Sequence, residues 1–166
     1  MYVYAGFFIL TGMTPLFKKL NYKQQDPIYV LNAPKSFEKE LAKLPVQILK
    51  AVPEGAAVEF GMAFVRTLEE LSQYGSQLGA HLKGDAIWWM CYPKKSSKRY
   101  TCDFDRDSGW EVLGEYSVEP VRNVAIDEDW TALRLRKVEY IKTLSRRRGI
   151  FISEAGRQRA ARENEK

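Results

Sequence analysis

The chain has 166 residues and a mass of 19.2 kDa, which is the size of one domain. With 45% apolar and 13% aromatic residues it can bury a core, so wholesale disorder is excluded. One histidine, His81, and two cysteines exclude multi-histidine metal sites, a disulfide framework and a four-thiolate zinc site. The longest apolar stretch, Val3 to Leu10, is too short for a membrane-spanning helix, so we expect no membrane partner.

Residues 1–13 are predicted to be an N-terminal extension. They are apolar and aromatic, but they lack the charged start and the small-residue cleavage site of a secretory signal. After Met13, the sequence Thr14-Pro15 suits the first turn of a helix. We therefore expect a cytoplasmic protein with a single α/β domain at 14–142 and a basic, helical or disordered tail at 143–166.

The basic character of the chain is concentrated at its C-terminal end. Residues 134–166 carry a net charge of +7, whereas the rest of the chain carries −2. Such a segment is typical of a solvated helix surface or of a site for an acidic partner, including nucleic acid. In the second case the contacts would come from Arg146, Arg147, Arg148 and Arg157.

The predicted elements alternate between strands and helices along the chain. Short apolar runs bounded by turn residues predict strands, and apolar residues at spacings of three and four predict helices. Ser36 is expected to cap the first helix, and Asp107 or Ser108 the third. The expected strands are 28–31, 46–49, 60–65, 86–92, 121–126 and 133–138, and the expected helices are 37–44, 68–82 and 110–116.

This alternation predicts an α/β fold with a mainly parallel sheet, flanking helices and a closing antiparallel hairpin. The order resembles the Rossmann-like fold of S-adenosylmethionine-dependent methyltransferases, whose sheet also ends in a hairpin. It would be a shortened version, because no helix separates Val46–Leu49 from Phe60–Val65. A ferredoxin-like α+β sandwich is the alternative.

Three polar loops are expected at one edge of this sheet. In open parallel sheets, ligands bind outside the carboxyl ends of the strands. That edge would collect Asn32 after the first strand, the segment 94–98 after the fourth, and the turn 127–130 of the hairpin. The candidate ligand-binding residues are Asn32, Lys94, Lys95, Ser96, Ser97, Asp127 and Trp130. Ammonium and hydroxyl groups together suit a phosphate or a carboxylate.

Structural explanations compete with each of these assignments. A Lys/Ser loop is often only an exposed turn. Asp127 can pin its own turn through a side-chain bond to the backbone, and Trp130 can pack beneath the hairpin. Trp88 and Trp89 are expected in the core on opposite faces of a strand, and Cys91 is expected to be a small core residue.

No standard catalytic or cofactor signature is present. The segment after the first strand reads Leu31-Asn32-Ala33-Pro34 rather than a glycine-rich loop. Asp103, Asp105 and Asp107 fall on a segment that lacks the glycine and glutamate positions of an EF-hand. The sequence therefore identifies no metal site, no cofactor and no oligomeric state.

Two motifs carry a second resemblance, which covers about residues 14–142. The segment 92–98, Tyr-Pro-Lys-Lys-Ser-Ser-Lys, is followed by 125–134, which contains Asp-Glu-Asp-Trp. Together with 30–34 they resemble the signature of a bacterial family of short α/β proteins that is catalogued as a domain of unknown function. The resemblance implies no activity, but it places the three loops at the family's signature positions.

The sequence thus favours a non-catalytic domain that binds a nucleotide- or phosphate-like anion at the carboxyl edge of its sheet. One alternative is a nucleic-acid or acidic-protein binder that acts through the basic tail. A second alternative is a degenerate S-adenosylmethionine-dependent methyltransferase, for which the first loop lacks the expected glycines.

Overall fold

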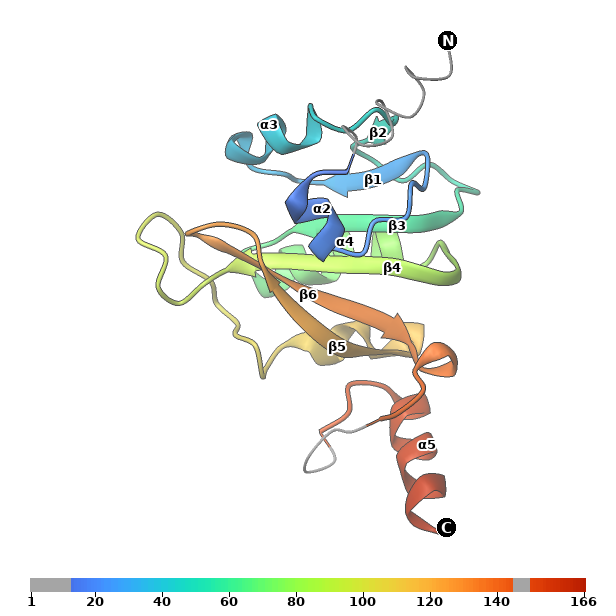
Figure 1. Cartoon of the computed structure of the whole chain (residues 1–166). Helices are drawn as coiled ribbons and strands as arrows, with labels where there is room; N and C mark the ends of the chain where they lie inside the picture. Colours follow the sequence, from blue (N-terminus) through green and yellow to red (C-terminus); the bar gives the residue numbers. More distant parts are fainter. Residues whose placement is uncertain (1–12, 145–149) are drawn as a thin grey trace.

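The computed structural model describes residues 13–144 and 150–166. Within them six strands form one sheet, in the order β2-β1-β3-β4-β6-β5 (Figure 1). The strands are β1 (Ile28–Leu31), β2 (Ile48–Leu49), β3 (Val58–Phe64), β4 (Leu82–Pro93), β5 (Val118–Ala125) and β6 (Trp130–Lys137). Pairing is parallel from β2 through β4, and β6 is antiparallel to both β4 and β5. The predicted mainly parallel sheet with a closing hairpin is confirmed, and the ferredoxin-like alternative is wrong.

Helices cover both faces of this sheet. They are α2 (Pro15–Lys19), α3 (Glu38–Leu41), α4 (Leu68–Gly79) and α5 (Glu154–Asn164), with the 3₁₀ turns η1 (Lys35–Phe37), η2 (Trp110–Tyr116) and η3 (Val138–Tyr140). Figure 1 shows α2 on one side of β3 and β4 and α4 on the other. Consecutive side chains of a strand point to opposite faces, so each face has its own core.

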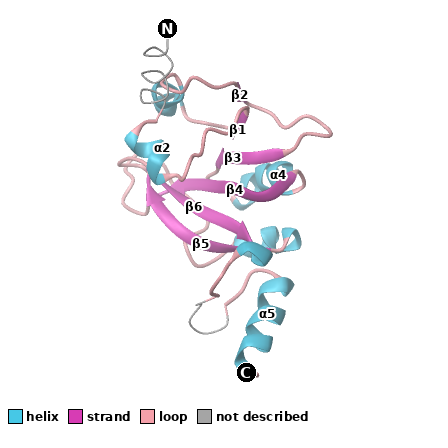
Figure 2. Cartoon of the chain, turned by 45° about the vertical axis from the view of Figure 1, so that its right-hand side comes forward, coloured by secondary structure: helices cyan, strands magenta, loops and turns pink. Residues whose placement is uncertain are grey.

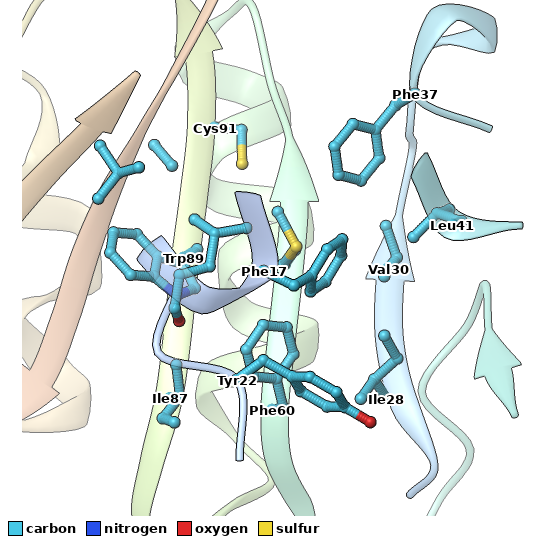
Figure 3. Packing of buried hydrophobic residues seen from close by; sticks show 14 of the residues in the cluster. Phe17, Tyr22, Ile28, Val30, Phe37, Leu41, Phe60, Ile87, Trp89 and Cys91 are labelled. Atoms are coloured by element: carbon cyan, nitrogen blue, oxygen red, sulfur yellow. The ribbon is translucent and has the colours of Figure 1, made fainter. Parts of the chain in front are cut away.

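The first core lies beneath α2 and α3. Phe17 of α2 packs at centroid distances of 6.2 Å from Phe37 and 6.1 Å from Phe60 (Figure 3). Trp89 of β4 is fully buried there, and its indole N–H donates to the Leu20 carbonyl at 2.8 Å. This bond uses a carbonyl at the end of α2 and fixes the helix on the sheet.

The second core lies beneath α4 and η2. Trp88 enters it from β4, alongside Leu71 and Leu78 of α4 and Leu113 of η2. The predicted placement of Trp88 and Trp89 on opposite faces is therefore confirmed. Thr67 caps α4 by accepting the Glu70 N–H at 3.0 Å.

Two expected helix caps are wrong. The helix after β1 begins as a 3₁₀ turn that follows Pro34, and the side chain of Ser36 caps nothing in it. The segment 110–116 is a 3₁₀ helix rather than an α-helix, and it follows Gly109 at φ 97°. Neither Asp107 nor Ser108 caps it, because Ser108 bonds back to Asp105. A residue with a Cβ adopts such a left-handed conformation poorly, so glycine suits this entry to the turn.

The strand bounds differ from expectation at the sheet edge and in the hairpin. In the hairpin, the expected strands 121–126 and 133–138 are β5 (Val118–Ala125) and β6 (Trp130–Lys137). The expected strand 46–49 is reduced to Ile48–Leu49, an edge strand that pairs with β1 alone. The helix expected over 68–82 ends at Gly79, and β4 already starts at Leu82. Residues 1–12 of the expected extension, and Arg146, Arg147 and Arg148, lie outside the described residues.

The C-terminal segment is attached to the sheet through a buried carboxylate. Glu119 of β5 is fully buried and accepts the backbone N–H groups of Ile152 and Ser153, at 3.0 and 2.8 Å. The Ser153 hydroxyl donates to the same carboxylate and accepts the Gly156 N–H, which caps α5. Figure 2 shows α5 at the end of the molecule formed by β5 and β6.

None of the helices within residues 13–144 and 150–166 combines the length and the apolar composition needed to cross a bilayer.

Candidate functional site

The carboxyl ends of β1, β3, β4 and β5 lie at one edge of the sheet. This follows from the pairing, because β6 runs against both of its neighbours and β5 is therefore parallel to β4. The loop after β4 and the β5–β6 turn are in direct contact, since the Lys94 N–H donates to the Asp129 carbonyl at 2.7 Å. The structure therefore places the three polar loops at the edge where ligands of open α/β sheets bind.

Asn32 joins the end of β1 to the end of β3. It has a left-handed backbone at φ 56°, which asparagine tolerates better than most residues. Its side-chain amide donates to the Phe64 carbonyl and to Glu70 Oε2, both at 2.8 Å. Both side-chain amide hydrogens are thereby used, so the Asn32 side chain positions the loop and has no N–H left for an anion.

The two serines of the loop 94–98, the middle one of the three polar loops, differ in their hydrogen bonds. Ser97 Oγ donates to Asp129 Oδ1 at 2.8 Å and accepts the Tyr100 N–H at 3.1 Å, so it closes the loop onto the hairpin turn. Ser96 is exposed and forms the outer part of the same turn.

The lysines of this loop carry its available charge. Lys94 is half-buried, and its ammonium forms no ion pair with the described residues. Lys95 is exposed, and its Nζ lies 3.8 Å from Asp105 Oδ2, a loose contact in water. Lys94 is therefore the less exposed of these two lysines.

Asp127 and Trp130 have structural roles in the hairpin turn. Asp127 Oδ1 accepts the N–H groups of Asp129 and Trp130, both at 2.8 Å, which is the turn-pinning arrangement. Trp130 is only 3% exposed, and its ring lies 5.1 Å from those of Phe64 and Tyr100. Its indole is therefore part of the core beneath the edge rather than an open stacking surface.

A hollow of about 760 Å³ opens beside the middle loop. Its lining includes the rings of Tyr92 and Phe104 together with Lys94, Lys95 and Ser97. This volume is within the usual range of small-molecule sites. The lining also includes residues 102–108, which no motif in the sequence marks as part of a binding site.

The charged groups around the hollow are Lys94, Lys95, Arg106, Asp103, Asp105 and Asp107. Two of the acids are bonded within the protein. Asp103 Oδ1 accepts the Leu68 N–H at 2.8 Å, at the start of α4. The Asp107 N–H and the Ser108 hydroxyl bond to Asp105 and hold the pKa of its carboxyl below the usual value.

The thiols near this edge are protonated at neutral pH. Burial, with a smaller effect of Asp127, raises the pKa of Cys91 well above its usual value. Burial also raises the pKa of Cys102, which lines the hollow, although a bond from the Phe104 backbone opposes the shift. A nucleophilic cysteine requires the thiolate, so neither thiol is activated.

Sheet order, strand directions and the position of the polar loops define a shortened α/β fold of the Rossmann-like class. Residues 14–142 lack a helix between β2 and β3, as expected from the sequence.

Several solved structures align with the chain at low sequence identity. An S-adenosylmethionine-dependent methyltransferase from Clostridium acetobutylicum is 5% identical, with a TM-score of 0.46 over 78% of this chain and 89% of that one. A ribosomal protein L11 methylase from Lactobacillus delbrueckii subsp. bulgaricus is 13% identical, with a TM-score of 0.43 over 74% and 77%. The pyocyanin biosynthetic protein PhzM is 10% identical, with a TM-score of 0.41 over 66% of this chain and 42% of that one.

No protein-family model and no curated protein sequence matches the chain. The resemblance to the bacterial family of short α/β proteins therefore stays a prediction.

Proposed function

We propose that this protein is a non-catalytic binder of a small nucleotide- or phosphate-like anion, held in the hollow beside the loop 94–98. The observation that carries the proposal is Lys94, a partly buried residue that lines a ligand-sized hollow and whose ammonium has no ion-pair partner among the described residues. A phosphate oxygen would provide the missing partner.

The loop is held in place for this task before any ligand arrives. The Lys94 N–H bonds to the Asp129 carbonyl at 2.7 Å, and Ser97 bonds to the Asp129 carboxylate at 2.8 Å. A loop that is already fixed loses little conformational entropy on binding, which favours affinity. Asp127 contributes indirectly, because it holds the turn on which Asp129 lies.

The chemistry of the lining favours binding over catalysis. Cys102 and Tyr92 both have pKa values raised chiefly by burial, so both are protonated at neutral pH. His81 lies away from the hollow, where its carbonyl accepts the Val58 N–H at the amino end of β3. The hollow thus offers charge and hydrogen bonds but no activated nucleophile.

The degenerate methyltransferase alternative draws support from the class of fold alone, and a fold does not determine a function. The loop after β1 has no glycine, and the side chain of Asn32 is tied to Phe64 and Glu70. S-Adenosylmethionine nevertheless belongs in the ligand screen, because stabilisation by it and not by anions would favour this alternative.

The nucleic-acid alternative through the tail has weaker support among the described residues. Arg157 pairs with Glu154 at 3.1 Å and donates to the Phe151 carbonyl at 3.2 Å. Arg146, Arg147 and Arg148 lie outside the described residues. Arg→Gln substitution at these three positions tests the alternative better than truncation, because truncation would also remove the segment that Glu119 binds.

A thermal-shift screen with inorganic phosphate, pyrophosphate, nucleotides and S-adenosylmethionine tests the proposal. A ligand that binds only the folded state raises the melting temperature in proportion to its occupancy. We expect at least one anion to stabilise the protein and Lys94→Ala/Lys95→Ala to abolish most of that effect. The matched control is Lys23→Ala/Lys83→Ala, which removes the same charge from exposed residues near the amino edge of the sheet. No stabilisation by any anion, or equal loss in both variants, would contradict the proposal.

A further inference from the structure

A group of three arginines lies on the hairpin away from the hollow. Arg134 on β6 is paired in register with Arg122 on β5, and Arg136 lies two residues further along β6. Residues that oppose each other across antiparallel strands have their side chains on the same face, about 5 Å apart at Cβ. The three arginines therefore share one face, which we call the arginine face.

The arginine face is on the same side of the sheet as α2. Arg134 is also in register with Trp89 of β4, whose indole reaches the Leu20 carbonyl at the end of α2. In Figure 1, α2 covers β3 and β4, and none of the described helices covers β5 and β6 on that side. The arginine face is thus open to solvent at Arg122, which is exposed, whereas Arg134 is buried.

Arg134 is buried without an ion-pair partner among the described residues. It is 9% exposed, and its Nε has no hydrogen-bond partner among the described residues. Burial, together with the charges of Arg136 and Arg122, lowers its pKa, although Asp85 acts in the opposite direction. A buried charge without a partner is costly, and like charges that oppose each other across two strands destabilise the pair.

The acid next to this group does not neutralise Arg134. Asp85 binds Arg136 through both of its oxygens, at 2.9 Å to Nε and 2.6 Å to Nη2. Arg122 is exposed and forms no ion pair within residues 13–144 and 150–166. Arg122 and Arg134 therefore form no ion pair with the described residues of this face.

From this arrangement we infer that the arginine face is a second anion site, specific for a phosphate group. The guanidinium fork matches phosphate geometry, and a phosphate between Arg122 and Arg134 would remove the repulsion between them. Arg122 is exposed, which gives a ligand access to this face. The phosphate can belong to a small molecule or to a nucleic-acid backbone.

The test isolates this site from the loop 94–98, called the lysine loop below, by using the Lys94→Ala/Lys95→Ala protein as background. In it, inorganic phosphate should raise the melting temperature above that in chloride of equal ionic strength. Arg134→Met should remove this increment and should raise stability in chloride, because it removes an uncompensated buried charge. Arg122→Gln, at an exposed position, should weaken phosphate binding about tenfold without unfolding the protein.

Arg162→Gln on α5 is the charge-matched control and should leave the phosphate increment unchanged. A mixed-sequence single-stranded oligonucleotide, titrated at several salt concentrations, separates the two sources. Arg134-dependent binding with a steep salt dependence assigns the phosphate to a nucleic-acid backbone, whereas stabilisation by phosphate alone assigns it to a small molecule. Absence of a phosphate increment in the lysine-loop background, or its persistence in Arg134→Met, would overturn the inference.

Discussion

The carboxylate of Glu119 accepts the backbone N–H of Ser153 at 2.8 Å in the fully buried junction between β5 and α5. The partial positive charge at the start of a helix favours a carboxylate at this position. One acidic side chain therefore attaches the basic C-terminal helix to a sheet that is otherwise complete without it.

We predict that Glu119→Gln destabilises the protein by about 2–3 kcal/mol, because it faces an amide N–H₂ toward buried donors. Hydrogen exchange at the backbone of 154–164 should accelerate more than exchange in β3 and β4. Glu115→Gln, at an exposed position in η2, is the control and should change neither quantity. Unchanged exchange in α5 would show that Glu119 does not hold the helix.

Gly114 tests the same junction from the other side. A Cβ at this position would lie 1.9 Å from the Ile152 carbonyl oxygen, a backbone atom that cannot turn aside. We expect Gly114→Ala to release α5 and to increase its exchange as Glu119→Gln does. The comparison variant is Ala80→Gly, at the exposed end of α4. Gly55→Ala would not serve as a control, because Gly55 has a positive φ that alanine adopts poorly. Protection of α5 in Gly114→Ala equal to that of the wild type would contradict the close approach.

The two tryptophans of the first core should respond differently to loss of the indole N–H. Trp89 donates to Leu20, whereas the Trp130 Nε1 is buried without a hydrogen-bond partner among the described residues. Both substitutions to phenylalanine remove similar volume, but only Trp89→Phe leaves a carbonyl without its donor. We expect Trp89→Phe to be more destabilising by about 1 kcal/mol in denaturant unfolding. Equal losses would mean that the indole bond to Leu20 contributes nothing.

Stability at acid pH should depend on Asp85. The hydrogen bond from Arg136 lowers the pKa of this carboxyl, and the effect exceeds the opposing effect of burial. A lowered folded-state pKa gives stability that is present above the unfolded pKa, about 4, and is lost as pH falls through the folded value. Asp85→Asn should therefore flatten the decrease in melting temperature below about pH 4. Glu59→Gln should leave this pH dependence unchanged, because Glu59 and its partner Lys83 are exposed and 3.9 Å apart.

The sequence predicts the sheet well because its strands are short apolar runs bounded by turn residues. The apolar run around Trp88 and Trp89 and the turn at Asp127 follow from periodicity and from local side-chain-to-backbone bonding, both of which act over a few residues. The lysine loop likewise follows from its position after a strand. These features depend on local chemistry and on a general rule of parallel sheets.

Other features depend on contacts between distant segments, and the sequence does not indicate them. Glu119 and Ser153 are 34 residues apart, and nothing in either segment marks them as partners. The burial of Arg134 depends on its register with Trp89, 45 residues earlier, which periodicity does not specify. The 3₁₀ form of 110–116 depends on the backbone of Gly109, for which side-chain caps are no guide.

The most direct test of the central claim is a ¹⁵N NMR titration with the anion that stabilises the protein best. We predict that the largest shifts fall on the amides of 94–97 and of Tyr100, with smaller shifts at Asp129 and Trp130, and that they disappear in Lys94→Ala/Lys95→Ala. Shifts confined to α5 or to the amino edge of the sheet, or a titration that leaves the amides of 94–97 unmoved, would contradict the account.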